Sequence, residues 1–257
     1  MPEFVLTTEE LSLAFSLLGQ PEAGRSLMAT QLGEMSETEA RARLMAAGHS
    51  LIARGGMALG PEGPVLNEDL ARAVGLLLRA DFSIRYSRST PDAEFNLAYH
   101  FGQNIILEHR LEQGIAHHLN EVPDAATVIK SGLVFFGVPQ AEPFQSPATT
   151  IPYSLLNEIK NLDDPAQIDH RLQEIGVDGG VRPLLAEDLA HPQYRGSVLR
   201  VQSDAQGNLF SEEGFLLLHG PRRLWLITLS GTQRTTATLM PATVQAFHQE
   251  TAALIHR

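Results

Sequence analysis

Residues 82–87 read FSIRYS, and residues 95–101 read FNLAYHF. In both stretches a large apolar side chain alternates with a polar or small one, which is the period of a half-buried β-strand. After a short turn, residues 105–109 (IILEH) return along the preceding strand, and a further strand is expected around residues 115–119. The pattern predicts an antiparallel β-meander, followed by a helix over residues 123–135.

The second half of the chain repeats this order. The first half contains SIRY, NLAYHFG, IILE and, after a proline, ATV, at residues 83–86, 96–102, 105–108 and 126–128. The second half contains VLRV, FLLLHG, LWLI and, after a proline, ATV, at residues 198–201, 215–220, 224–227 and 242–244. A duplicated unit explains the repeat, and chance similarity of two meander–helix units is the alternative. Duplication predicts that Arg85 superposes on Arg200, His100 on His219, and Ile105–Leu107 on Leu224–Leu226.

An antiparallel meander leaves a face for helices to cover, so each half is expected to be α+β. We expect an N-terminal half at residues 1–138 and a C-terminal half at residues 153–257. The prolines of residues 139–152 indicate an extended, exposed connector, because proline cannot donate to a ladder or a helix.

The N-terminal region is expected to be helical. Thr7-x-x-Glu10 and Ser36-x-x-Glu39 are capping boxes, and Asn67 caps a further helix. The Gly- and Pro-rich residues 55–65 predict a loop or small hairpin, so the segment is winged-helix-like.

The net negative charge of this N-terminal region argues against DNA binding. Its would-be recognition helix carries Arg41, Arg43 and Arg54, but residues 1–80 hold six basic and ten acidic residues. Contacts to phosphate supply most of the non-specific affinity for nucleic acid, so we do not expect nucleic acid as a partner. Packing of the helices on the sheet, with a protein-binding edge, is the simpler interpretation.

Composition narrows the class of protein further. The 257 residues carry a net charge of −11 and no cysteine, so disulfides, thiolate metal sites and thiol catalysis are excluded. No basic leader and no apolar stretch of membrane-spanning length is seen, so we expect an acidic cytoplasmic protein.

The histidines do not predict a metal site or an acid–base pair. His117 and His118 are adjacent on an expected strand and point to opposite faces, so they cannot chelate one ion. His100 and His219 occupy matching places before turns, which favours a structural role.

The remaining candidates for a functional motif, a glycine-rich stretch and two acidic pairs, are also interpreted as structural. Residues 176–180 (GVDGG) are expected to be a loop, Asp163-Asp164 a helix cap and Glu187-Asp188 a solvated pair. No nucleotide-binding or nucleophile-elbow motif occurs. We therefore expect no catalytic residue, no cofactor and no metal.

Trp225, the single tryptophan, lies in the stretch LWLIT at residues 224–228. Leu224, Leu226 and Thr228 share one face of this strand, and Trp225 and Ile227 share the other. A strand that is apolar on both faces is usually covered on both sides, so we expect a core tryptophan near Phe247. The alternative is a partly exposed anchor for a binding partner.

The layout resembles a known family. Four helices precede a strand meander, and a similar second half ends in TLMPAT at residues 238–243 before an amphipathic helix. This resembles the EspG-type chaperones of type VII secretion. The resemblance implies a quasi-two-fold fold and binding of helical secreted proteins in the cytosol, and it carries over no binding residue.

The leading hypothesis is therefore a non-enzymatic protein-binding module, either an adaptor or a secretion chaperone. Apolar strand faces or edges would offer a surface on which a helix docks. A winged-helix DNA-binding regulator with a C-terminal sensing half is the alternative. An enzyme with an unrecognised site around His100 and His219 is the third possibility.

Overall fold

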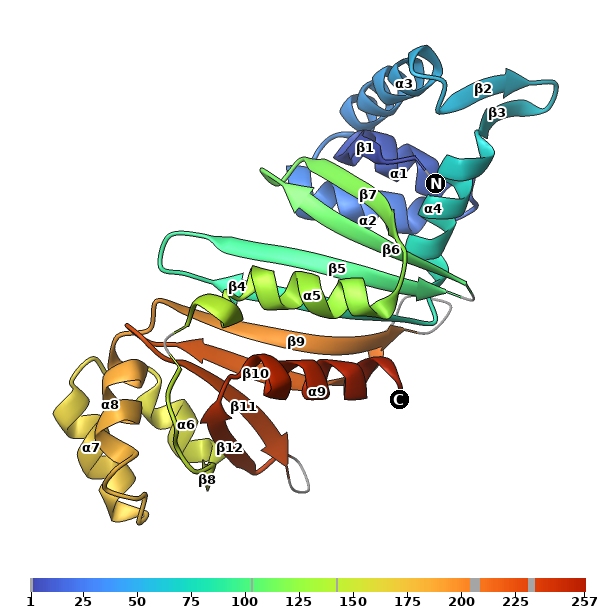
Figure 1. Ribbon diagram of the computed structural model, residues 1–257. Coiled ribbons are helices and arrows are strands. Elements are labelled where there is room, and N and C mark those ends of the chain that lie inside the picture. Colours follow the sequence, from blue (N-terminus) through green and yellow to red (C-terminus); the bar gives the residue numbers. More distant parts are fainter. Residues whose placement is uncertain (1, 103, 142, 204–208, 231–233) are drawn as a thin grey trace. The chain divides into compact units, whose positions relative to one another are not determined.

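The computed structural model describes residues 2–102, 104–141, 143–203, 209–230 and 234–257 (Figure 1). The chain forms two compact units, and neither is continuous in sequence. The first unit consists of residues 1–83, 97–124 and 202–210, and the second of residues 84–96, 125–201 and 211–257.

The first half of the sequence begins with an edge strand, continues through helices and ends in a meander and a helix. Its elements are β1 (Phe4–Thr7), α1 (Thr8–Leu17), α2 (Pro21–Leu32), α3 (Glu37–Ala53), β2 (Met57–Gly60), β3 (Gly63–Leu66), α4 (Glu68–Arg79), β4 (Phe82–Ser89), β5 (Glu94–Gly102), β6 (Ile105–Glu112), β7 (Ala116–Val122) and α5 (Ala125–Phe135). Thr7, Ser36 and Asn67 cap α1, α3 and α4, which confirms the helix starts predicted from the sequence. The β2–β3 hairpin follows α3, as a winged-helix-like segment requires.

The second half repeats this order. Its elements are a 3₁₀ turn (Val138–Gln140), β8 (Thr149–Pro152), α6 (Tyr153–Ile159), α7 (Pro165–Glu174), α8 (Arg182–Ala190), β9 (Tyr194–Ser203), β10 (Leu209–His219), β11 (Leu224–Ser230), β12 (Thr236–Pro241) and α9 (Val244–Ile255). The fold is therefore α+β with two similar halves, each an antiparallel meander packed with helices, as predicted. In each half the early edge strand pairs with the last strand of the meander, β1 with β7 and β8 with β12.

In the first unit the strands are ordered β1-β7-β6-β5, and the pairs β1–β7, β7–β6 and β6–β5 are antiparallel. One sheet face packs against α1 and α4. Leu107 of β6 and Leu119 of β7 form its core with Leu11 of α1 and with Leu70 and Val74 of α4. This core fixes α1 on the sheet.

In the second unit the order is β4-β9-β10-β11-β12-β8. The central strand β11 is covered on both faces, which explains its run of apolar residues. On one face Phe215, paired opposite Thr228, meets Phe247 of α9 at a ring distance of 5.7 Å. On the other face Trp225 and Ile227 pack with residues of α6, α7 and α8.

The strand register corrects one detail of the predicted repeat. His100 lies opposite Leu107 in the β5–β6 pair, whereas His219 lies opposite Leu224 in the β10–β11 pair. If His100 superposes on His219, then their strand partners Leu107 and Leu224 superpose as well. The sequence had instead matched Leu107 with Leu226, two positions further along. The joint alignment of both stretches is therefore wrong, because six residues separate His100 from its partner Leu107, whereas only four separate His219 from its partner Leu224. Duplication itself stays a prediction.

The expected connector at residues 139–152 is wrong in part. Its end is β8, an edge strand paired with β12, in which Ile151 is buried. Phe144, in the middle of the stretch, packs edge-on against Trp225. Residues 1–138 and 153–257 remain predicted domain limits, because the compact units draw on both halves. Among the described residues no helix has the length and apolarity needed to cross a membrane.

Candidate functional site

A hollow in the first unit lies between α1, α2 and α3, and we call it the three-helix groove. Its volume is about 630 Å³. The apolar part of its lining comes from Met28, Ala29, Met35, Ala40 and Leu44. Met28 is almost fully buried, whereas Ala29 is exposed, so the lining passes from packed core to open surface.

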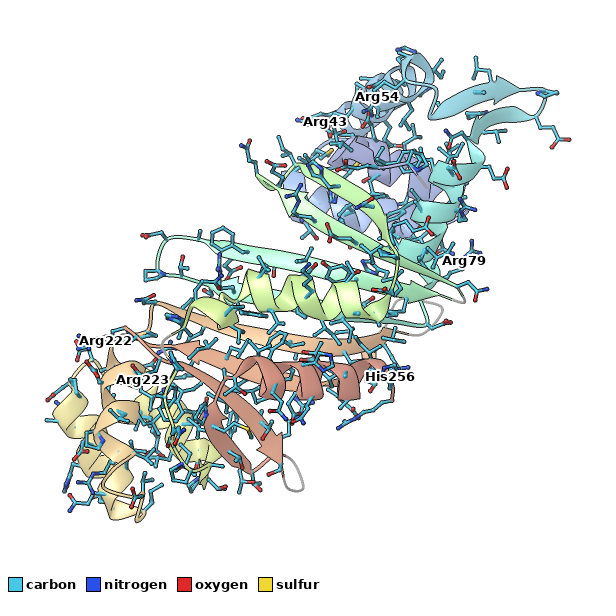
Figure 2. All side chains as sticks on the ribbon, viewed as in Figure 1. Arg43, Arg54, Arg79, Arg222, Arg223 and His256 are labelled. Carbon is cyan, nitrogen blue, oxygen red and sulfur yellow. The ribbon has the colours of Figure 1, made fainter. Side chains whose placement is uncertain are left out.

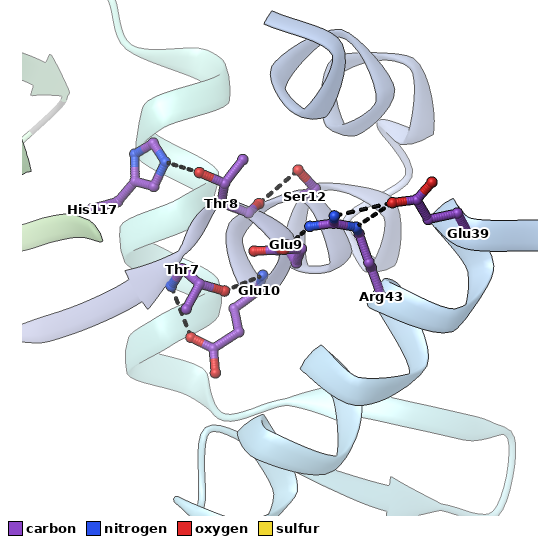
Figure 3. Close-up of polar contacts among 8 residues, drawn as sticks. All are labelled: Thr7, Thr8, Glu9, Glu10, Ser12, Glu39, Arg43 and His117. Atoms are coloured by element: carbon purple, nitrogen blue, oxygen red, sulfur yellow. Dashed lines mark hydrogen bonds and ion pairs between the residues drawn. The ribbon is translucent and has the colours of Figure 1, made fainter. Parts of the chain in front are cut away.

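One wall of the groove is α1, which is held rigidly at its start. The hydroxyl of Thr7 accepts a hydrogen bond from the backbone N–H of Glu10, and the Glu10 carboxylate accepts one from the N–H of Thr7 (Figure 3). Arg54 of the cap of α3 forms an ion pair with Glu10, whose side chain is only 2 % exposed. Arg54 also donates to the carbonyl oxygen of Val5, so it covers a backbone acceptor of the edge strand β1. This capping box therefore links α1, α3 and the sheet.

A second ion pair fixes α3 against α1. The guanidinium of Arg43 bonds to Glu39 at 3.0 Å and to Glu9 of α1 at 3.1 Å (Figure 3). These hydrogen bonds raise the pKa of Arg43. Arg43 and Arg54, both labelled in Figure 2, are two of the three arginines of the would-be recognition helix. Because both are engaged with carboxylates, the helix offers little free positive charge for phosphate.

Close packing of α1 against α2 closes the bottom of the groove. A Cβ atom added to Gly24 of α2 would lie 2.5 Å from the carbonyl oxygen of Ser12. The two backbones therefore approach more closely than any side chain allows. The Ser12 hydroxyl donates to the carbonyl of Thr8, and the Ser16 hydroxyl donates to the carbonyl of Ser12. Both serines thus donate their hydroxyls to carbonyls of their own helix.

Charge on the groove is predominantly negative. Glu34 and Glu37 line it together with one cation, Arg25. Arg25 forms an ion pair with Glu22 on the same helix. The lining and this paired carboxylate thus carry three negative charges and one positive charge.

A ladder of histidines lies under α1, on strands β5, β6 and β7. His117 bonds to His109 at 2.9 Å and to the hydroxyl of Thr8 at 3.2 Å, and the His100 and His109 rings are 5.8 Å apart. His100 in turn bonds to Ser83 at 2.9 Å. Burial lowers the pKa of His117 to about 4, so its ring is neutral near pH 7. The ladder joins the sheet to α1 through the bond between His117 and Thr8.

His117 and His118 point to opposite faces, as predicted. His117 is buried, whereas His118 is partly exposed and meets Glu3 and Glu112. Among the described residues no group of three or more histidine or acidic side chains is placed to hold a metal ion. His219 lies in the second unit, where its ring stacks on Tyr194 at 5.0 Å, so His100 and His219 belong to different clusters.

The acidic pair Glu187-Asp188 differs from its prediction. Asp188 is fully buried, accepts a hydrogen bond from the Trp225 indole at 2.8 Å and pairs with Arg223 at 2.7 Å. Glu187 is exposed and meets Arg223 from outside (Arg223 is labelled in Figure 2). The prediction of a solvated pair is wrong for Asp188, because its partners come from a strand far along the sequence.

Trp225 is a core residue, but its neighbours differ from those predicted. It is fully buried and packs edge-on against Phe144 at 4.7 Å, whereas Phe247 lies on the other face of β11. Its role as a partner anchor stays a prediction, and it would require the side chain to leave this core.

Two smaller predictions agree with the structure. Asp164 caps α7 by accepting a hydrogen bond from the N–H of Ala166, and residues 176–180 form a loop. The three-helix groove itself was not predicted. Its only sequence signals are the pair Met28 and Met35 and the glycine at position 24, which are meaningful only once α1 and α3 are placed beside α2.

A family model described as "Uncharacterised protein YfjC" matches residues 3–239. No curated protein sequence gives a significant match. A solved structure with a similar fold is that of the Mycobacterium tuberculosis type VII secretion system chaperone EspG5 in complex with the PE25–PPE41 dimer. The similarity has a TM-score of 0.67 and 14 % sequence identity, and it covers 99 % of this chain and 96 % of that one. At this identity the likeness shows the fold, which is the one that the resemblance implied.

Proposed function

This chain belongs to the YfjC family, and from that premise we propose that it is a non-enzymatic protein-binding module, an adaptor or secretion-chaperone-like protein of the cytoplasm. Its partner is a protein that presents a helix. The three-helix groove is the surface that receives this helix.

The observation that supports the proposal most is the combination of fold and groove. EspG5, which shares the fold over nearly the whole of both chains, was solved bound to a protein dimer. The groove supplies what helix docking needs, since apolar side chains lie beside one another in a hollow of about 630 Å³. The capping box of α1 and the ion pair between Arg43 of α3 and Glu9 of α1 hold these two helices in place. Binding a helix between them would therefore cost little conformational entropy of the groove.

The alternatives receive less support. DNA binding would need free arginines on α3, and two of its three arginines are bonded to glutamates. An enzyme acting through His100 and His219 receives no support from their contacts, since His100 bonds to Ser83 and the His219 ring stacks on Tyr194. The edge strands β1 and β8 offer four residues each, which is short for docking a strand.

Site-specific photo-crosslinking in the native cells tests the proposal. Ala29 lines the groove and is exposed, so it is replaced by benzoylphenylalanine, and Ala42, exposed on α3 but outside the lining, is the matched control. We expect irradiation to join a second protein to the Ala29 variant and much less of it to the Ala42 variant. Equal adducts at both positions, or none at either, would refute the groove as the binding surface.

A further inference from the structure

We infer that the groove selects a basic amphipathic helix, with apolar residues one and two turns apart and Lys or Arg on the flank that meets Glu34 and Glu37. This inference rests on the proposed function and specifies the chemistry of the partner at the same site. It follows from two independent properties of the groove. One is its apolar floor, formed by Met28, Met35 and Leu44, and the other is its charged margin, formed by Glu34 and Glu37.

The apolar floor sets the kind of anchor. Met28, Met35 and Leu44 come from α2, the following loop and α3, so they converge on the hollow from different elements. Methionine is unbranched and adapts to different shapes, which suits a surface that receives side chains of varied sequence. Helices dock in such grooves through residues at positions i, i+3 or i+4, and i+7.

The charged margin of the groove determines which charge the partner helix should carry. Glu34 and Glu37 line the groove, and two arginines of its walls already have carboxylate partners. Arg25 is paired with Glu22, and Arg43 is paired with Glu9 and Glu39. A basic helix would therefore find carboxylates without displacing an existing ion pair, which favours it over an acidic one.

Backbone dipoles do not reverse this sign. The groove contains the C-terminal end of α2 at Gly33, which carries partial negative charge, and the N-terminal end of α3 at Glu37, which carries partial positive charge. Each end corresponds to roughly half an elementary charge, so the two contributions approximately cancel. The carboxylates of Glu34 and Glu37 therefore set the sign of the charge at the groove. They also disfavour a fatty acid as the ligand, because its carboxylate would be repelled by theirs.

Fluorescence anisotropy with synthetic peptides tests the inference on the full chain. The probes are two labelled 18-residue helices with the same leucine stripe, one with lysine and one with glutamate on the flanks. We expect the Leu/Lys peptide to bind at least tenfold more tightly than the Leu/Glu peptide at 150 mM salt. Replacing Ala29 by Trp should fill the groove and weaken Leu/Lys binding at least tenfold, whereas the matched change Ala42→Trp should alter it less than twofold.

Charge reversal separates this inference from non-specific attraction to an acidic protein. The double variant Glu34→Lys/Glu37→Lys should abolish or invert the preference, and Glu62→Lys, on the exposed β2–β3 turn, should leave it nearly unchanged. If Ala29→Trp weakens both peptides equally and the preference is absent, the groove binds helices and only the basic partner is refuted. If neither peptide responds to Ala29→Trp, both the groove and the charge inference fail.

Discussion

The carboxylate of Asp188 on α8 accepts a hydrogen bond from the indole nitrogen of Trp225 on β11 at 2.8 Å, and both side chains are fully buried. The same carboxylate pairs with Arg223, whose side chain is only 12 % exposed. One acidic residue thus satisfies a buried donor and a nearly buried cation at once. The helix and the strand are joined by this contact in addition to their apolar packing.

Replacing Asp188 should destabilise the protein far more than replacing its neighbour. Asp188→Ala leaves the Arg223 charge and the indole N–H without their buried partner, and such a loss costs about 3–5 kcal/mol. Glu187 is half exposed, so Glu187→Ala should cost less than about 1 kcal/mol. Urea unfolding of both variants measures the difference in the free energy of unfolding. Equal effects would mean that Asp188 contributes no more than a surface ion pair.

Trp225 reports on the same core by fluorescence. As the single tryptophan and fully buried, it should emit at short wavelength and resist quenching by acrylamide. Trp225→Ala should lower the free energy of unfolding by about 3–5 kcal/mol, as large-to-small core substitutions do. Emission typical of a solvated indole, together with an unchanged melting temperature, would instead return Trp225 to the candidates for partner binding.

Gly24 should be intolerant of even a methyl group. The Cβ of Gly24→Ala would press on the backbone carbonyl of Ser12, so α1 and α2 must move apart, at a cost of about 1–3 kcal/mol. Gly75 in the interior of α4 is the matched control, since an added Cβ there meets only the mobile end of Arg79 at 3.5 Å. Gly75→Ala should leave stability unchanged or raise it by up to about 1 kcal/mol. Thermal unfolding followed by circular dichroism compares the two.

The helix caps were predictable from the sequence, whereas the close packing at Gly24 was not. Local signals were sufficient for α1, α3 and α4, because Thr7, Ser36 and Asn67 each accept a hydrogen bond from the residue three positions ahead. Most strands of the two meanders were predicted as well, since the alternation or apolar run that marks a strand is a property of that strand alone. Nothing comparable marks Gly24, whose constraint comes from a carbonyl on another helix.

Elements that depend on distant partners escaped prediction. The edge strands β1 and β8 have four residues each and exist because β7 and β12 offer them a ladder. Asp188 was assigned to solvent because only the fold places Arg223 and Trp225 beside it. The groove is a property of three helices together, so the sequence predicted a helix-docking protein without predicting the surface.

His117 should make stability depend on pH. Burial lowers the pKa of its ring to about 4 in the folded protein, against an ordinary value of 6.5. Above pH 6.5 the ring is neutral in both states, and its contribution to stability is fully present. As the pH falls from 6.5 to 4, the unfolded chain takes up a proton that the folded chain excludes, so the free energy of unfolding decreases. At about 1.36 kcal/mol per pKa unit the loss from this group is about 3 kcal/mol, and it is complete near pH 4.

The variant His117→Gln removes the titrating ring and retains an amide that can bond to the hydroxyl of Thr8. Its free energy of unfolding, measured with urea at pH 7.5, 6.0, 5.0 and 4.5, should fall less steeply with acid than that of the natural protein. His118→Gln is the matched control, because His118 is the next residue on the same strand and its side chain is on the opposite, more exposed face. That variant should keep the steep decline. If His117→Gln declines as steeply as His118→Gln, another buried group governs the acid sensitivity, and the neutral ring under α1 has no part in it.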